Sequence, residues 1–364
     1  MTAGQAARGK TLAETSFAFY LSVIQEGGTM ADHILLTGIS GFIAKHVALK
    51  LLGAGYAVRG TLRRLDRAEE VRKALRPHLN AEAMERLSFV QADLEDDAGW
   101  SAAMADVAAV VHTASPFPVE QPKDAQVLIR PAVEGTLRVL KAAREAGVRR
   151  VILTSSTAAV VDGGVKGMQD ETNWADLTRP DVSVYTRSKT LAERAAWEFA
   201  RREGLALTVI NPGFVLGPPL DANFGSSVGV VRRILRGRDP LVPMLGFVCV
   251  DVRDVAEMHL RALQRPETAG KRYLATSGSM TMPDMAHVLK QAHPGRRIPT
   301  GVAPKLVLRL LALFDPQIRA ILPNLGQLHE VSNARAAAEM GMDFVPPADA
   351  LKATADWLIN AGAV

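Results

Sequence analysis

Tyr185 and Lys189 are the residues of this sequence whose types and spacing most directly suggest catalysis. They are four residues apart in the segment YTRSK, and on a helix such residues lie on one face. A phenol with a pKa of about 10 is a poor base at neutral pH, but a neighbouring ammonium favours the phenolate and lowers that pKa. The pair could therefore exchange a proton with the alkoxide that forms when a hydride is transferred to a carbonyl. Ordinary amphipathic helices also carry this spacing, so the argument depends on the surrounding segments.

A cluster of hydroxyl side chains follows an apolar segment upstream of this pair. Residues 150–155 read RVILTS, a composition typical of a buried strand, and Ser156 and Thr157 continue the hydroxyl cluster. A hydroxyl at the carboxyl end of a strand could bind the carbonyl oxygen as negative charge develops. Ser and Thr at strand ends also commonly bond the local backbone, which is the alternative interpretation.

A glycine-containing turn near residue 38 has the spacing of a dinucleotide-binding loop. Gly38 would permit the tight turn, Gly41 would let the backbone approach a pyrophosphate, and the small Ala44 would let the following helix pack closely on the strand. The helix N-terminus would direct free N–H groups at the phosphates. The residues expected to form this part of the site are Gly38, Ser40, Gly41, Phe42 and Ile43.

Two arginines follow the second expected strand, where NAD-binding proteins usually carry an acidic residue for the ribose hydroxyls. These are Arg63 and Arg64, with Arg59 a few residues upstream. The planar guanidinium binds oxyanions through paired hydrogen bonds, so it suits the 2′-phosphate of NADP(H). Solvated surface arginines are the alternative. The sequence therefore favours NADP(H) over NAD(H).

Short segments after the third and fourth expected strands would complete the cofactor site. An Asp-Leu pair after the third strand could meet the amino group and the face of the adenine ring. A Thr-Ala-Ser segment after the fourth strand would line the central part of the cofactor, and the histidine before it, His112, is expected to pack at the strand end. The residues assigned to these two parts are Asp93, Leu94, Thr113, Ala114 and Ser115.

Apolar strands alternate with helical segments from residue 33 to residue 211, which predicts an α/β fold with a doubly wound parallel sheet of the Rossmann type. Ligands of such a sheet bind at the carboxyl ends of the strands, where the loops named above lie. The expected strands are His33–Thr37, Ala57–Leu62, Leu87–Gln91, Val107–His112, Arg150–Ser155 and Leu205–Asn211, and the expected helices include Phe42–Ala54, Leu128–Ala146 and Tyr185–Glu203.

Changes in composition and in the pattern of apolar segments suggest how the chain is divided into domains. Residues 1–29 are expected to be an N-terminal extension, either a short helix or disordered. Residues 30–216 would form the NADP-binding domain. Residues 217–364, rich in proline and glycine at their start, would form mainly a smaller substrate-binding lobe, with residues 247–264 returning to the Rossmann sheet.

Composition narrows the class of protein. The net charge is +5, but Lys and Arg are scattered among acidic residues, so we expect no nucleic-acid partner. No apolar segment reaches the length of about 18 residues that a membrane span requires. The single cysteine, Cys249, excludes an internal disulfide and fits a reducing cytoplasm. We expect a cytoplasmic monomer or homodimer that binds a small molecule and no metal.

These segments together resemble the extended short-chain dehydrogenase/reductase superfamily, and within it the branch of dihydroflavonol 4-reductases and NADPH-dependent aldehyde/ketone reductases. The resemblance implies that Ser156 is the catalytic serine, that Tyr185 is the general acid and that Lys189 is its partner. It also implies that Asn211, Pro212 and Phe214 flank the nicotinamide. The matching segments are residues 33–44, 58–63, 151–156, 170–174, 185–197 and 211–218.

The sequence departs from the branch where the substrate is expected. Plant dihydroflavonol reductases often carry an asparagine five residues after the catalytic serine, and this chain has Val161 there. Val161 and Pro116 are assigned to the substrate pocket, and they favour a less polar aldehyde, ketone or diketone over a polyhydroxylated flavonoid. The Asn-Trp-Tyr-Cys-Tyr signature of cinnamoyl-CoA reductases is absent, which disfavours a thioester.

Two other functions remain open from the sequence. The chain could be an NAD-dependent sugar-nucleotide epimerase or dehydratase, or a 3β-hydroxysteroid-type dehydrogenase, because these share the glycine loop and the Tyr–Lys pair. It could also be a non-catalytic redox sensor that binds NADP(H). Such sensors tend to lose the Tyr–Lys pair, which this chain keeps.

Overall fold

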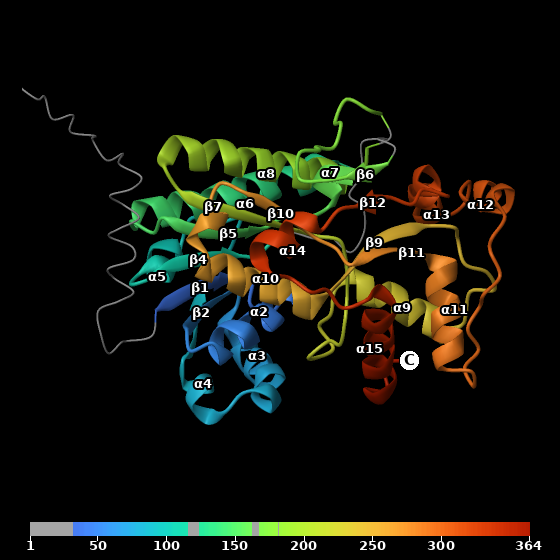
Figure 1. The fold of residues 1–364 in the computed structure, drawn as a ribbon, viewed down its shortest axis with the longest axis horizontal. Coiled ribbons are helices and arrows are strands. Elements are labelled where there is room, and N and C mark those ends of the chain that lie inside the picture. The colour runs from blue at the N-terminus through green and yellow to red at the C-terminus, as the bar shows by residue number, and fades with distance from the viewer. Residues whose placement is uncertain (1–31, 116–123, 162–166, 181) are drawn as a thin grey trace, which may run out of the picture. The chain divides into compact units, whose positions relative to one another are not determined.

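Parallel strands form the central sheet of the computed structural model, which describes residues 32–115, 124–161, 167–180 and 182–364. Within these residues the sheet has seven strands in the order β10-β7-β5-β4-β1-β2-β3 (Figure 1). This order confirms the predicted doubly wound parallel fold, with the switch point for ligand binding beside β1. The strands are β1 (His33–Thr37), β2 (Ala57–Leu62), β3 (Leu87–Gln91), β4 (Ala109–His112), β5 (Arg150–Thr154), β7 (Ala206–Pro212) and β10 (Arg272–Ala275).

Consecutive residues of the central strands belong to two different apolar clusters. Leu36 of β1 and Val111 of β4 lie in one cluster, whereas Leu35 and Val110 lie in the other. All four side chains are fully buried. Both faces of the sheet are therefore covered, which explains why these strands read as continuous apolar runs rather than as an alternation of apolar and polar residues.

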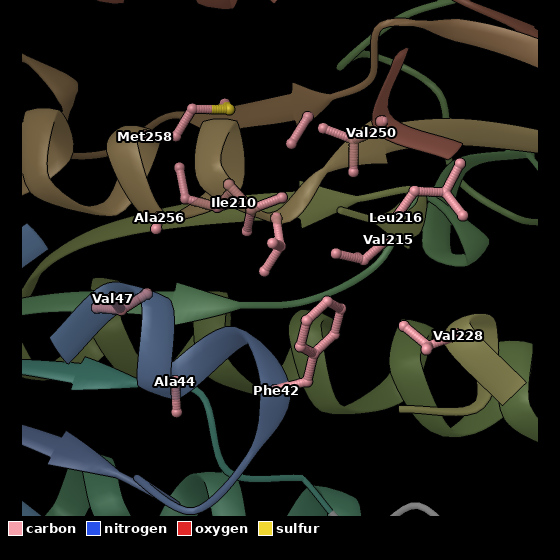
Figure 2. Packing of buried hydrophobic residues seen from close by; sticks show 14 of the residues in the cluster. Phe42, Ala44, Val47, Ile210, Val215, Leu216, Val228, Val250, Ala256 and Met258 are labelled. Carbon is pink, nitrogen blue, oxygen red and sulfur yellow. The ribbon is translucent and has the colours of Figure 1, made fainter. Parts of the chain in front are cut away.

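Helices cover the two faces of the sheet (Figure 1). On one face lie α2 (Phe42–Gly53) and α10 (Val252–Gln264), which contact each other. Figure 2 shows side chains of both helices beside Ile210 of β7 in the larger apolar cluster. On the opposite face lie α6 (Gln126–Glu145) and α8 (Val184–Glu203), which form the most extensive helix pair in the described part of the chain.

Both ends of α8 have local chemistry that fixes them. Ser183 precedes the helix, and its hydroxyl oxygen accepts a hydrogen bond of 3.0 Å from the backbone N–H of Thr186, which satisfies a free donor of the first turn. Gly204 follows the helix in the left-handed conformation, with φ of 68°, which glycine adopts without a steric penalty. The predicted helix is thus confirmed to within one residue, and Tyr185 lies in its first turn.

A separate three-stranded sheet corrects one prediction. The segment 247–264 was expected to return to the Rossmann sheet, but its strand, β9 (Gly246–Asp251), pairs with β8 (Phe214–Leu216) and β11 (Gly278–Thr281) instead. Only the helix of that segment, α10, packs on the central sheet. The seventh strand of the central sheet is β10, whose apolar run, residues 273–275, is too short to give a clear pattern in the sequence.

The remaining elements connect these layers or belong to the C-terminal part. His33–Val364 forms one compact unit, so the predicted division at residue 217 stays a prediction, and the predicted extension 1–29 lies outside the described residues. In the described part of the chain, no helix is long and apolar enough to cross a membrane. The other helices are α3 (Ala68–Leu75), α4 (Ala81–Glu85), α5 (Trp100–Met104), α7 (Ala158–Val161), α9 (Ser226–Arg236), α11 (Met282–Ala292), α12 (Lys305–Leu311), α13 (Pro316–Ile321), α14 (Ala334–Met340) and α15 (Pro347–Asn360). The other strands are β6 (Met168–Gln169) and β12 (Glu330–Val331), and the 3-10 turns are Leu65–Arg67, Arg76–His78, Pro266–Thr268 and Leu322–Asn324.

Candidate active site

The glycine turn after β1 is packed tightly against two neighbouring strand ends. Gly38 has φ of 67°, and a Cβ atom placed on it would lie 3.0 Å from the Cα and Cβ atoms of Ala114 after β4. Its backbone N–H donates a hydrogen bond of 2.9 Å to the hydroxyl of Thr61 in β2. A Cβ on Gly41 would lie 3.2 Å from the carbonyl oxygen of Gly38. The glycines therefore allow the tight turn, and the approach of a pyrophosphate to Gly41 stays a prediction.

The N-terminus of α2 begins directly after this turn. Gly41 is the residue before the helix, and no side chain caps the free N–H groups of the first turn, so these donors are available to an anion. The ring of Phe42 does not face this end: it lies in the apolar cluster with Val215 and Val228 (Figure 2). The Phe42 side chain is buried in that cluster, so its backbone is the part left to contact a cofactor. Ile43 is half-buried, and its side chain packs partly against the same cluster.

Arg63 and Arg64 follow β2 at the predicted position and are exposed, which agrees both with a 2′-phosphate contact and with solvated surface arginines. Arg64 is 72% exposed and lies 3.5 Å from Asp66, so its guanidinium is free to reorient. Arg59 differs, because it donates a hydrogen bond of 3.1 Å to the carbonyl oxygen of Ala103 at the end of α5. The two arginines at the strand end are therefore the pair that a 2′-phosphate could recruit.

Arg67 is a further cation beside the glycine turn that the sequence argument missed. Its Nη1 atom lies 3.5 Å from the hydroxyl oxygen of Ser40. Its Nε and Nη2 atoms donate hydrogen bonds of 3.0 and 2.8 Å to the two carboxylate oxygens of Glu70. Glu70 thus holds the guanidinium so that one nitrogen points at the turn. No clear signal in the sequence pointed to Arg67, because its place beside Ser40 depends on the 3-10 turn Leu65–Arg67.

The Asp93–Leu94 pair lies after β3, where it was expected. The Asp93 carboxylate accepts a hydrogen bond of 3.2 Å from the backbone N–H of Glu95, which fixes the turn. Leu94 packs against Gly135 of α6, where an added Cβ would lie 2.8 Å from the leucine Cβ. The close approach of α6 explains the glycine, and the predicted adenine contacts stay a prediction.

A hydroxyl at the end of β1 organises the segment after β4. The oxygen of Thr37 accepts hydrogen bonds from the backbone N–H groups of Thr113 and Ala114, at 3.1 and 3.0 Å. Its own proton is then directed to Nδ1 of His112, 2.7 Å away. Burial lowers the pKa of His112 to about 3. His112 is therefore a neutral imidazole near pH 7, which holds the strand end in place and cannot act as a general acid.

Three elements bring the predicted catalytic side chains together. Tyr185, at the start of α8, is hydrogen-bonded to the hydroxyl of Ser156, which follows β5. Lys189 lies one helical turn further along α8, with Nζ 6.0 Å from the centre of the Tyr185 ring. The same Nζ donates a hydrogen bond of 3.0 Å to the hydroxyl of Ser115 after β4. The carboxyl ends of β4 and β5 and one face of α8 thus form a single polar site.

The ionisation of this site differs from the prediction. Burial raises the pKa of Tyr185 above its ordinary value of 10.0, and the hydrogen bond to Ser156 opposes the rise. Burial lowers the pKa of Lys189 from 10.5 to about 8, while the carboxylate of Glu193 opposes the fall. The expectation that Lys189 lowers the pKa of Tyr185 is wrong here, because burial dominates and the ammonium is directed to Ser115. At neutral pH both groups carry their protons.

The residues assigned to the nicotinamide and substrate lie at the same edge of the sheet or outside the described residues. Pro212 ends β7, and its carbonyl oxygen accepts a hydrogen bond of 2.9 Å from Thr157. The Phe214 ring packs against Phe247 of β9, with 4.4 Å between ring centres. Val161 ends α7 in a small apolar cluster with Val160 and Leu274. Pro116 lies outside the described residues. In the part of the chain that the structure describes, no group of three or more His, Cys, Asp or Glu side chains could hold a metal.

The fold and the site together define a dinucleotide-binding α/β protein with a Ser–Tyr–Lys constellation. The chain belongs to the NAD dependent epimerase/dehydratase family, whose model matches residues 34–275. It is 35% identical to cinnamoyl-CoA reductase 1 of Arabidopsis thaliana over 274 residues, which cover 73% of this chain and 76% of that protein. It is 32% identical to an anthocyanidin reductase of Vitis vinifera over 284 residues, covering 73% of this chain and 82% of that protein. These relatives confirm the resemblance that the sequence motifs predicted.

Solved structures share the fold over nearly the whole chain. The yeast methylglyoxal/isovaleraldehyde reductase Gre2, in complex with NADPH, matches with a TM-score of 0.75 and 29% identity, covering 91% of this chain and all of that chain. The UDP-glucuronic acid 4-epimerase of Bacillus cereus matches with a TM-score of 0.72 over 90% of this chain and 99% of that chain, but with only 17% identity. The second likeness concerns the fold alone.

Proposed function

We propose that this chain is an NADP(H)-dependent oxidoreductase that interconverts a carbonyl group and an alcohol. The observation that carries the proposal is the meeting of Ser156, Tyr185 and Lys189 beside the glycine turn, at the carboxyl edge of the sheet. The likeness to the NADPH complex of the yeast methylglyoxal/isovaleraldehyde reductase supports it. The relatives named as cinnamoyl-CoA and anthocyanidin reductases support the same class of reaction.

The residues around the turn fit a phosphorylated dinucleotide. The space that a Cβ would fill at Gly38 and Gly41 and the uncapped N-terminus of α2 suit a pyrophosphate. The 2′-phosphate would be held by Arg63 and Arg64, with Arg67 on the side of Ser40. The remaining parts of the cofactor would be held by residues after the successive strands, namely Asp93 and Leu94 at the adenine, Thr113, Ala114, Ser115 and Lys189 at the centre, and Pro212 and Phe214 at the nicotinamide.

Each polar side chain has a role in carbonyl reduction. Bound NADPH supplies the hydride that reaches the carbonyl carbon. Tyr185 donates its phenolic proton to the oxygen, which leaves as the alcohol, and the raised pKa of Tyr185 keeps that proton in place until then. The Ser156 hydroxyl hydrogen-bonds the oxygen as its charge develops. The Lys189 ammonium stabilises the resulting phenolate, since its pKa of about 8 leaves it charged at neutral pH.

The residues assigned to the substrate pocket favour a weakly polar carbonyl compound. Val161 is 9% exposed and has only apolar neighbours in its cluster, so it offers no hydrogen bond to a substrate hydroxyl. With Pro116 it would line a pocket for an aldehyde, ketone or diketone. We also propose a cytoplasmic location, since the one cysteine, Cys249, is buried and free, and a monomer or homodimer.

Oxidation of NADPH with a set of carbonyl compounds tests the proposal. Aldehydes, α-diketones, aryl ketones and dihydroflavonols would be compared, each with NADPH and with NADH, at neutral pH. We expect turnover with NADPH on at least one aldehyde, ketone or diketone, and a kcat/KM at least about 10-fold lower with NADH, as the loss of one charged phosphate contact implies. Tightly retained NAD in the purified protein, without turnover of any carbonyl, would favour an epimerase instead.

A further inference from the structure

Glu193 is a fully buried carboxylate that accepts hydrogen bonds from four side chains. Its Oε2 atom lies 2.6 Å from the hydroxyl of Ser155, 2.7 Å from Nδ2 of Asn211 and 3.1 Å from Nη2 of Arg272. Its Oε1 atom lies 2.9 Å from Nε of Arg272 and 3.2 Å from Nε1 of Trp197. The side chain of Glu193 is 0% exposed. Through this carboxylate, α8 is hydrogen-bonded to residues at the ends of β5 and β7 and at the start of β10.

These bonds lead directly to the backbone that carries Ser156. Ser155 precedes it in the chain, and its backbone N–H donates to the carbonyl oxygen of Ile210 in β7 at 2.7 Å. Asn211 donates through the same amide nitrogen to Glu193 and, at 3.1 Å, to the carbonyl oxygen of Ser156. An amide nitrogen has two protons, so each bond has its own. The carboxylate therefore holds both residues of the turn that presents the Ser156 hydroxyl.

The same residue is connected to the other two members of the site through α8. Glu193 lies one helical turn after Lys189 and two turns after Tyr185, on a continuous helix. Fixing Glu193 to the sheet fixes the rotation of α8, and with it the place of the phenol relative to Ser156. The carboxylate is also the charge that opposes the fall in the pKa of Lys189.

The hydrogen bonds of Glu193 indicate a role in catalysis rather than a role in stability alone. A buried ion pair replaced by apolar groups is often no less stable, so the pair between Glu193 and Arg272 is weak evidence for a role in stability. Arg272 has other anchors, since it stacks 3.9 Å from the centre of the Trp174 ring and donates to the carbonyl oxygen of Asn173 at 2.9 Å. The bonds to Ser155 and Asn211 point instead toward the catalytic turn.

We propose that Glu193 is a positioning residue for the reaction, which aligns the Ser156 hydroxyl with the Tyr185 phenol. The proposal rests on the proposed function of the same site. The charged and titratable groups that face this arrangement are Arg272 on β10, with Glu171 and Arg335 beside it, Lys189 and Tyr185 on α8, and His112 on β4, which is neutral.

Glu193→Gln is the variant that tests the proposal, with Glu198→Gln, an exposed carboxylate on the same helix, as the matched control. We expect kcat to fall about 10- to 100-fold in Glu193→Gln, the size of effect that a small misplacement of a catalytic group produces, while the KM for NADPH changes by less than about 3-fold. Glu198→Gln should keep both constants. A folded Glu193→Gln protein with the kcat of the wild type would overturn the proposal.

The ionisation of the site gives a second, independent measurement. Loss of the carboxylate removes the charge that raises the pKa of Lys189, so the alkaline limb of kcat should move to lower pH. The pKa of Tyr185 should rise, because the hydrogen bond from Ser156 that lowers it is lost. Phenolate absorbance of the protein without added cofactor, with Tyr185→Phe subtracted, measures this directly. An unchanged pKa of Tyr185 and an unchanged alkaline limb would contradict the proposal.

Two further variants keep the outcome unambiguous. Where Glu193→Gln fails to fold, because it leaves Arg272 buried without a counter-charge, Ser155→Ala removes one hydrogen bond to the carboxylate and keeps the charge. It should lower kcat about 3- to 10-fold, as the loss of one hydrogen bond implies, and a wild-type kcat would count against the proposal. Tyr185→Phe separates the two ideas. If it keeps its activity, the proposed function fails, whereas an inactive Tyr185→Phe beside a fully active Ser155→Ala defeats only the role of Glu193.

Discussion

Replacing Lys189 by methionine should stabilise the protein while it abolishes catalysis. Burial lowers the pKa of Lys189 from 10.5 to about 8. At neutral pH this difference corresponds to about 3 kcal/mol of unfavourable free energy for keeping the ammonium charged in the fold. Methionine has a similar length and no charge, but the hydrogen bond to Ser115 is lost, at a cost of about 1 kcal/mol. The net expectation is a gain of about 2 kcal/mol in the free energy of unfolding.

The dependence on pH has a definite sign. The folded protein binds fewer protons than the unfolded chain between pH 8 and 10.5, since the folded pKa of Lys189 is the lower of the two. The free energy of unfolding of the wild type therefore rises with pH across that interval. Below pH 8 the full cost of burying the charged Lys189 ammonium is present. The advantage of Lys189→Met should be largest at pH 7 and should shrink as the pH approaches 10.5.

Urea unfolding of the wild type and the variant at several pH values measures both effects. Lys141→Met is the control, because Lys141 is 70% exposed on α6, and its unfolding free energy should stay within about 0.5 kcal/mol of the wild type. A Lys189→Met protein that is less stable than the wild type at pH 7, or a difference that does not change with pH, would refute the reasoning.

Two other predictions concern the cofactor turn. Gly38→Ala forces an L residue to φ of 67° and places its Cβ 3.0 Å from Ala114. Thermal unfolding should therefore show a loss of at least about 1–2 kcal/mol in the free energy of unfolding, and NADPH titrations should show weaker binding. An unchanged melting temperature would contradict this prediction. Arg67→Ala should raise the KM for NADPH about 10-fold and leave that for NADH within about 2-fold, as the loss of one charged contact implies. Steady-state kinetics would compare it with Arg76→Ala, a surface arginine 62% exposed, and equal effects of Arg67→Ala on both cofactors would count against a 2′-phosphate contact.

The central strands could be predicted because both faces of the sheet are buried. The inner strands β1, β4, β5 and β7 are apolar along most of their length, and the helices α2, α6 and α8 are long enough to show their own period. The sequence did not predict β10, because its apolar run, residues 273–275, is short and lies between polar residues. The segment 247–264 was predicted to return to the Rossmann sheet, but its strand β9 lies in the three-stranded sheet, since an apolar run carries no information about its pairing partner.

The site was predictable where function depends on local spacing. Gly38 and Gly41, or Tyr185 and Lys189, lie within one turn or one loop, so their geometry follows from the sequence. The role of Glu193 could not be predicted, because three of its four side-chain partners lie 18 to 79 residues away in the chain. The direction of the pKa of Tyr185 could not be predicted either, because burial, which the sequence does not quantify, outweighs the nearby charge.

Tyr185→Phe tests the central claim most directly, because it removes one oxygen from the meeting point of Ser156 and Lys189 and leaves the glycine turn intact. The measurement is the single-turnover rate of NADPH oxidation with a carbonyl substrate that the wild type reduces, together with NADPH binding. The proposed chemistry predicts a fall in rate of at least about 10²-fold, the usual contribution of a general acid, with NADPH binding retained. A rate within about 3-fold of the wild type would show that the proton comes from elsewhere.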